Sequence, residues 1–78
     1  MRNTYAESIV EEVTKQLTQL RKAKKISHEK LSQKSGITRC GIAHIEHMRR
    51  KPSLLTALKI AHALDMKLWQ VLKKIEEK

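Results

Sequence analysis

The spacing of apolar residues constrains this chain most, because apolar positions recur at steps of three or four residues. One run steps by four, four and three positions, through Ile9, Val13, Leu17 and Leu20. This spacing places all four on one face of a helix with about 3.6 residues per turn. Strands have little to build on, since aromatic residues make up 3% of the chain and β-branched runs are few. The sequence therefore predicts an all-α protein.

Capping signals mark the first two helices. The first is expected from about residue 5 to about residue 24, with Thr4 as N-cap and Glu7 three residues later in a capping-box pattern. Ser27 caps a short second helix. Gly36 follows the end of that helix, where a left-handed residue commonly terminates helices. A tight turn is expected at this glycine.

Three further helices are expected on the same grounds. Thr38 caps a third helix over about 38–46, and Ser53 caps a fourth. A break near Asp65 separates the fourth helix from the last one. The predicted buried positions are Ile42 and Ile45 in the third helix, Leu55, Leu58, Ala61 and Leu64 in the fourth, and Leu68, Val71 and Leu72 in the fifth.

Charge and length limit the class of protein. The 17 Lys and Arg residues outnumber the 8 Asp and Glu residues, which gives a formal charge of +9. Such a balance favours a polyanionic partner, nucleic acid first. With 78 residues, the chain is expected to be one domain over 1–78, of marginal stability unless it oligomerises.

Two further features exclude other classes. The single cysteine cannot form a disulfide within the chain and fits a reducing cytosol. No uncharged apolar run approaches the ~18 residues of a membrane span. The composition therefore disfavours a secreted scaffold, a membrane protein and an enzyme with a large pocket.

The two short helices around Gly36 carry the most specific signal. In a helix-turn-helix the second helix crosses the first closely, so a small residue is needed at the crossing and a glycine at the turn. Ser32 and Gly36 stand at these two places. Apolar side chains that would hold the second helix down follow at Ile37, Ile42 and Ile45. Together these residues predict a helix-turn-helix over about 27–46.

With these residues assembled, the chain resembles the Cro/phage-repressor (XRE-type) helix-turn-helix family over about residues 11–73. The segments that carry the resemblance are Leu20-Arg21, Ile26 to Leu31, Ile45-Glu46, Lys51 to Leu54 and Leu58 to Leu64. The resemblance implies a compact five-helix, lambda-repressor-like DNA-binding domain. Its third helix, over about 38–46, would be the recognition helix that enters the major groove of double-stranded DNA.

The resemblance also implies contacts, carried over position by position. Contacts to bases fall on Arg39, Cys40 and His44, and Arg39 is the strongest of them because a guanidinium can bond guanine O6 and N7 together. Contacts to phosphates fall on Ser27, His28, Thr38, His47, Arg49, Arg50 and Lys51. Arg21 and Glu46 match positions that form a buried ion pair in some family members. Expected structural residues are therefore Arg21, Ser32, Gly36, Ile42, Ile45 and Glu46.

Four positions depart from the family pattern. Glycine usually stands where this chain has Lys25, Met48 and Asp65. Because Lys and Met tolerate left-handed geometry poorly, we expect connections of a different shape there. Gly41 lies inside the recognition helix at a cost of about 1 kcal/mol relative to Ala, and we expect it to let the backbone approach DNA closely.

Metal and catalytic chemistry are not expected. Cys40, His44 and His47 share a helix face, as zinc ligands can, but no second Cys or matching His pair completes a site. No nucleophile has a pocket and an oxyanion hole beside it. The sequence therefore predicts that the protein is not an enzyme and that it binds no metal ion and no cofactor. It also predicts that His62 is a partly buried structural residue.

The sequence thus predicts a cytoplasmic, nucleoid-associated transcriptional regulator, a homodimer on a near-palindromic operator. Trp69 is the candidate dimer anchor, and the first helix, with Tyr5, Ile9 and Val10, is the competing surface. Two alternatives stay open. One is an antitoxin or restriction-control protein of the same fold, with a toxin or another regulator as partner. The other is a protein–protein adaptor that uses Trp69 and the first helix.

Overall fold

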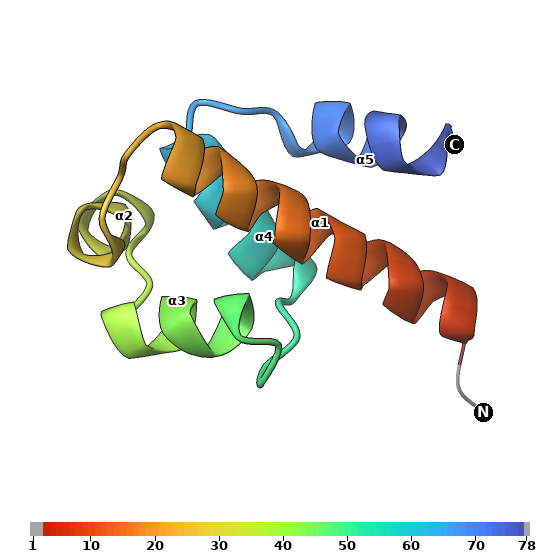
Figure 1. Ribbon diagram of the computed structural model, residues 1–78, viewed down its shortest axis with the longest axis horizontal. Coiled ribbons are helices and arrows are strands. Elements are labelled where there is room, and N and C mark those ends of the chain that lie inside the picture. The colour runs from red at the N-terminus through yellow and green to blue at the C-terminus, as the bar shows by residue number, and fades with distance from the viewer. Residues whose placement is uncertain (1–2, 78) are drawn as a thin grey trace.

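A computed structural model describes residues 3–77, and this part of the chain forms five α-helices and no strand (Figure 1). The helices are α1 (Thr4–Ala23), α2 (His28–Ser35), α3 (Arg39–Glu46), α4 (Leu54–Ala63) and α5 (Leu68–Glu76). The predicted all-α, five-helix architecture is confirmed.

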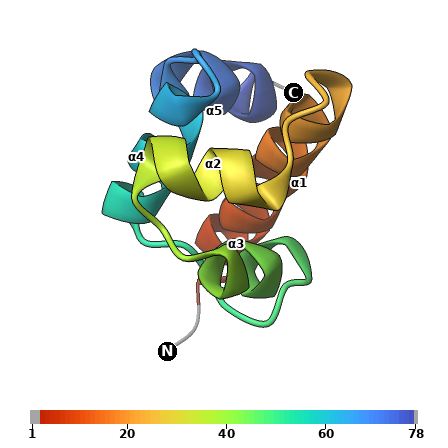
Figure 2. The same ribbon diagram turned by 90° about the vertical axis from the view of Figure 1, so that its left-hand side faces the viewer.

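The long helix α1 crosses the molecule, and three other helices pack against it (Figure 1). It contacts α3, α4 and α5, whereas α2 contacts α3 and α4. Figure 2 shows α3 and α5 on opposite sides of the molecule, with α2 and α4 between them. The helix-turn-helix and the C-terminal helix therefore present separate surfaces.

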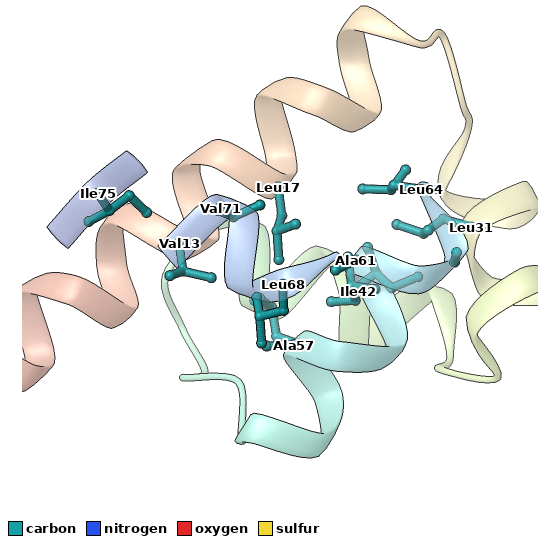
Figure 3. Close-up of a cluster of buried hydrophobic side chains, with 13 residues drawn as sticks. Val13, Leu17, Leu31, Ile42, Ala57, Ala61, Leu64, Leu68, Val71 and Ile75 are labelled. Carbon is teal, nitrogen blue, oxygen red and sulfur yellow. The ribbon is translucent and has the colours of Figure 1, made fainter. Parts of the chain in front are cut away.

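One cluster of buried apolar side chains connects all five helices (Figure 3). Its least exposed large members are Leu31, Ile42 and Leu64, at 1%, 1% and 0%. The other members are Val13, Leu17, Ile45, Ala57, Ile60, Ala61, Ala63, Leu68, Val71 and Ile75. The predicted inner faces of the first, third and fifth helices are found in the core at most positions, with Ile75 as an addition. Ile9, Leu20 and Leu72 are partly buried and pack against it.

The buried face of α4 agrees with the prediction at Ala61 and Leu64 but not at Leu55 and Leu58. Leu55 and Leu58 are 62% and 46% exposed. The residues of α4 and its C-cap that face the core are Ala57, Ile60, Ala61, Ala63 and Leu64. Both sets have helical spacing, and three of the five residues that face the core are alanines. His62 is exposed as well, so the prediction that it is partly buried is wrong.

The helix starts follow the capping predictions, with one correction. Ser27, Thr38 and Ser53 accept hydrogen bonds from the backbone N–H three residues later, at 3.1, 3.0 and 3.1 Å. At α1, however, the N-cap is Asn3, whose Oδ1 accepts from the Ala6 N–H at 3.1 Å. Thr4 is the first helical residue, because the Asn before it caps a helix at least as well as Thr.

Four described residues adopt a left-handed backbone. Gly36 has a φ of 76°, as its place after α2 predicts. Lys25, Met48 and Asp65 have φ values of 57°, 61° and 58°. The expectation that these three connections have a different shape is therefore wrong, since they keep the geometry that glycine would adopt without strain.

Hydrogen bonds across each turn hold the three strained residues in place. In each case the N–H of the next residue donates to the carbonyl five positions before it, the pattern of a Schellman motif. The pairs are Ile26 to Arg21 at 3.1 Å, Arg49 to His44 at 2.8 Å and Met66 to Ala61 at 2.9 Å. The closure of these helix ends therefore overrides the residue preference at the turn.

An ion pair between Arg21 and Glu46 ties α1 to α3. Arg21 Nε donates to Glu46 Oε2 at 2.6 Å, and Arg21 Nη2 donates to Oε1 at 3.0 Å. The two side chains are only 12% and 11% exposed. Arg21 Nη1 also donates to the Ile26 carbonyl at 2.7 Å, and His28 Nε2 lies 2.9 Å from Glu46 Oε1. Glu46 thus joins the end of α3 to the end of α1 and the start of α2.

The ionisation of Glu46 depends on these partners. Burial raises its pKa and is the largest single influence, but the hydrogen bonds and charges of Arg21 and His28 together outweigh it and hold the pKa below 4.5. A carboxylate with a lowered pKa in the folded state adds stability above its unfolded pKa. That contribution disappears as the pH falls through the lowered value.

Glu46→Gln is expected to lower the free energy of unfolding by about 3 kcal/mol at pH 7, because Arg21 then stays buried without its counter-charge. Urea unfolding at pH 7 measures this loss. The gap between wild type and variant should shrink as the pH falls below 4.5. The double variant Arg21→Met/Glu46→Leu is the control. Its loss in free energy of unfolding should be smaller than the sum of the losses in Arg21→Met alone and Glu46→Leu alone. A Glu46→Gln protein of wild-type stability would contradict the role of the pair.

Lys25→Gly is expected to raise the free energy of unfolding by about 1 kcal/mol, since glycine removes the left-handed strain. Thermal unfolding should then show a midpoint about 4–8 °C higher. The matched control is Lys24→Gly one residue earlier, where φ is −82° and glycine should only cost stability. Equal losses in both variants would show that residue 25 is not strained.

Candidate nucleic-acid interface

The turn between α2 and α3 is closed by local hydrogen bonds. The Gly36 N–H donates to the Ser32 carbonyl at 2.9 Å, and the Ile37 N–H donates to Ser35 Oγ at 3.2 Å. Ser35 is 8% exposed, a buried hydroxyl that the sequence reasoning missed. A serine directly before a helix-ending glycine is the signal that could have identified it, because its hydroxyl can bond a nearby N–H.

The helix α3 has one side in the core and one side toward solvent. Ile42 and Ile45 are 1% and 5% exposed, whereas Arg39 and Cys40 are exposed and His44 is partly exposed. Cys40 Sγ lies 3.7 Å from His44 Nε2, one helical turn away. The three residues predicted to contact bases therefore lie together along α3, outside the core.

The starts of α2 and α3 open into a shared depression of about 720 Å³. It is lined by Ser27, His28, Glu29, Thr38, Arg39, Cys40 and Ala43. The first N–H groups of a helix lack partners within the helix and attract anions. Three of the predicted phosphate contacts thus share this depression with two of the predicted base contacts.

A second depression, of about 230 Å³, lies between the starts of α3 and α4. Thr38 borders this depression as well as the first. Arg50 and Lys51 line it together with Ser53, the N-cap of α4. Phosphate groups bind to basic side chains and to the free N–H groups at the start of a helix. His47 and Arg49 are exposed on the same connection between α3 and α4 but line neither depression.

Two of the predicted phosphate contacts have carboxylate partners within the chain. Lys51 Nζ donates to Glu7 Oε1 at 2.9 Å, and His28 lies against Glu46. These partners are 44 and 18 residues away in sequence, so no local pattern could reveal them. Lys51 and His28 therefore each have a carboxylate contact within the chain as well as their predicted role at phosphates.

Gly41 is explained in part by the cap of its own helix. Its N–H donates to Thr38 Oγ1 at 3.0 Å. A Cβ added at Gly41 would lie 3.0 Å from that same oxygen and 3.3 Å from Ile37 Cγ2. The glycine therefore gives the Thr38 cap its room, a local reason that stands beside the predicted close approach to DNA.

Within residues 3–77, no three His, Cys, Asp or Glu side chains are grouped so that they could hold a metal ion. No helix in this range combines the length and the apolar character needed to cross a membrane.

Comparison with known proteins places this geometry in a family. A family model described as helix-turn-helix matches residues 17–68, which span the end of α1 and all of α2, α3 and α4. The chain is also 37% identical over 65 residues to an uncharacterized HTH-type transcriptional regulator, y4dL, of Sinorhizobium fredii (strain NBRC 101917 / NGR234). This match covers 83% of the chain and 33% of the relative, so the chain spans about a third of that protein. No solved structure matches the chain significantly.

The family match covers more than half of the chain and includes the whole helix-turn-helix. It agrees with the resemblance seen in the sequence and with the interpretation of the chain as a binding protein rather than an enzyme. The chain belongs to the XRE-type helix-turn-helix family of DNA-binding proteins.

Proposed function

We propose that this chain is a sequence-specific transcriptional regulator that binds double-stranded DNA as a homodimer on a near-palindromic operator. The observation that carries the proposal is the division of α3, which buries Ile42 and Ile45 and turns Arg39 and His44 outward. The printed name of the Sinorhizobium fredii relative, a transcriptional regulator, supports the regulatory role. The protein would act in the cytoplasm, on the DNA of the nucleoid.

The outer side of α3 supplies the groups for base recognition. Arg39 is the first residue of α3, and the N-terminal residues of a recognition helix reach base edges in the major groove. Its guanidinium matches guanine O6 and N7. His44 can donate to or accept from a base edge, and Cys40 offers a weak or apolar contact. Arg39 is therefore the main determinant of sequence preference in this proposal.

Phosphate binding would come from the two depressions beside the start of α3. Ser27 and His28 border one of them, and Arg50 and Lys51 border the other. The sugar–phosphate backbones run along both edges of the major groove, so contacts on two sides of α3 would hold it in register. Thr38 borders both depressions, and His47 and Arg49 add exposed basic groups nearby.

A homodimer that reads one face of the duplex requires half-sites about 34 Å apart, one helical turn.

Two other roles use the same surfaces. An antitoxin or restriction-control protein would bind DNA through the same α3 and add a toxin or another regulator as partner. A protein–protein adaptor is favoured by Trp69 and Tyr5, which are 59% and 61% exposed. The adaptor role requires a ratio of specific to non-specific DNA binding near one, whereas a sequence reader exceeds it by orders of magnitude.

Arg39→Ala is expected to cost about 1–3 kcal/mol of binding free energy on the preferred operator and to relax preference at one base pair. The operator is first selected from a randomised duplex pool with the wild-type chain. Fluorescence anisotropy on the operator and on a scrambled duplex then measures the variant. Equal losses on both duplexes would remove Arg39 from base recognition, and failure to enrich any sequence would favour the adaptor.

Arg50→Ala is expected to weaken binding to every duplex alike and to reduce the slope of log K against log salt by about 0.9, the value for one phosphate contact. Titration of binding at several salt concentrations measures the slope. The matched control is Lys74→Ala on α5, an exposed residue on the helix opposite α3 (Figure 2), which removes the same charge. Equal changes of slope in both variants would assign the effect to net charge alone.

A further inference from the structure

The contact between His28 and Glu46 decides where the histidine ring carries its proton. His28 Nε2 lies 2.9 Å from Glu46 Oε1. Burial raises the pKa of Glu46, but the hydrogen bonds and charges of Arg21 and His28 outweigh it and hold that pKa below 4.5. Glu46 is therefore ionised at neutral pH, and an ionised carboxylate only accepts hydrogen bonds. Nε2 is then the donor, so a neutral His28 ring keeps its single proton on Nε2.

The other ring nitrogen, Nδ1, is left to meet a ligand outside the protein. The His28 side chain is 35% exposed and lines the depression at the starts of α2 and α3. In a neutral imidazole with its proton on Nε2, Nδ1 is a hydrogen-bond acceptor. A phosphate oxygen is an acceptor too, so the neutral ring cannot donate to a phosphate from Nδ1. That contact requires a second proton, which makes both ring nitrogens donors and the ring a cation.

We propose that DNA binding is linked to the uptake of one proton by His28, whose cationic ring then bridges the Glu46 carboxylate and a backbone phosphate. The inference rests on the DNA binding of the proposed function and adds its dependence on pH. Histidine ordinarily loses its proton near pH 6.5, so the uptake falls in the physiological range. A ring between two anions keeps its proton to higher pH than a ring beside one. The affinity for DNA therefore rises as the pH falls.

Glu46 acts as a positioning residue for this bridge. Its side chain is 11% exposed and accepts two hydrogen bonds from Arg21, so its oxygens are held in place from α1. Glu46 also ends α3, whereas His28 begins α2. A phosphate bound by His28 is thus connected to the same carboxylate that helps to orient the recognition helix.

Other titratable groups surround His28, so the experiment has to distinguish them from it. The Cys40 thiol lines the same depression, and His44 lies 3.7 Å from its sulfur; both belong to residue types that titrate near neutral pH. On α4, which also packs against α2, Lys59 and His62 are exposed and do not line the depression. The other charged neighbours belong to types that keep one charge between pH 6 and 8: Arg21 on α1, Glu29 on α2, and Arg39 and Glu46 on α3.

The linkage is measured on the selected operator between pH 6 and pH 8 at constant ionic strength. Fluorescence anisotropy should show the affinity for each bound chain falling about fivefold over this range, the size expected for one histidine whose proton is held about one pH unit higher in the complex. Titration calorimetry in two buffers of different ionisation enthalpy counts the protons directly. It should find about half a proton taken up per bound chain at pH 7.

His28→Gln tests whether the proton goes to this residue. The glutamine amide has two N–H donors, so it can contact Glu46 and a phosphate without taking up a proton. The variant should keep its helical circular dichroism and lose at least about half of both the pH dependence and the proton uptake. The matched control is His62→Gln, the same replacement at an exposed histidine that lines neither depression. It should keep the wild-type pH dependence.

Three results would overturn the proposal. The first is a ¹⁵N NMR spectrum of the free chain that places the proton of the neutral His28 ring on Nδ1. The second is a wild-type affinity that does not change between pH 6 and pH 8. The third is a His28→Gln variant that keeps the wild-type pH dependence, at whatever affinity, which would assign the titration to His44 or another group. None of these results contradicts DNA binding itself, whereas a chain that binds no duplex at any pH would refute the proposed function and this inference with it.

Discussion

The position of α3 depends on one buried carboxylate. Glu46 ends α3 and accepts two hydrogen bonds from Arg21 near the end of α1, while His28 at the start of α2 lies against the same group. Three elements thus converge on a side chain that is 11% exposed. A buried charge is costly without partners, so arrangements that separate these elements are disfavoured. The ion pair therefore restricts the orientation of α3 together with its apolar contacts.

The need for such a constraint follows from the lengths of the helices. α2 and α3 have eight residues each, and isolated helices of that length are not stable in water. Their N-caps and the Gly36 turn define where they begin and end. Their orientation comes from Leu31, Ile42 and Ile45 in the shared core. The side chains of α3 that are proposed to contact bases are consequently held by a core that other helices help to form.

The molecule separates two kinds of surface. The side with α3 carries Arg39 and the basic connection between α3 and α4, and the proposed function uses it for DNA. Large apolar side chains are exposed on two other helices, at Leu54, Leu55 and Leu58 of α4 and at Trp69 of α5. One small core supports both, because α4 turns its alanines inward and its leucines outward.

Local signals in the sequence determined the number of helices, most of their boundaries, the turn at Gly36 and the family, since caps, turns and apolar spacing act over a few residues. Asn3, rather than the predicted Thr4, caps α1, and this cap is also an interaction between residues close in sequence. The sequence indicated Ala61 and Leu64 as buried, but tertiary structure alone decided that Ala57, Ile60 and Ala63 are buried in place of Leu55 and Leu58. Both sets of residues have helical spacing, and only packing against neighbouring helices distinguishes them. Tertiary structure also decided the partners of His28 and Lys51 and the left-handed turns at Lys25 and Met48. These depend on contacts between distant residues and on the closure of helix ends, which outweigh the preference of any single residue.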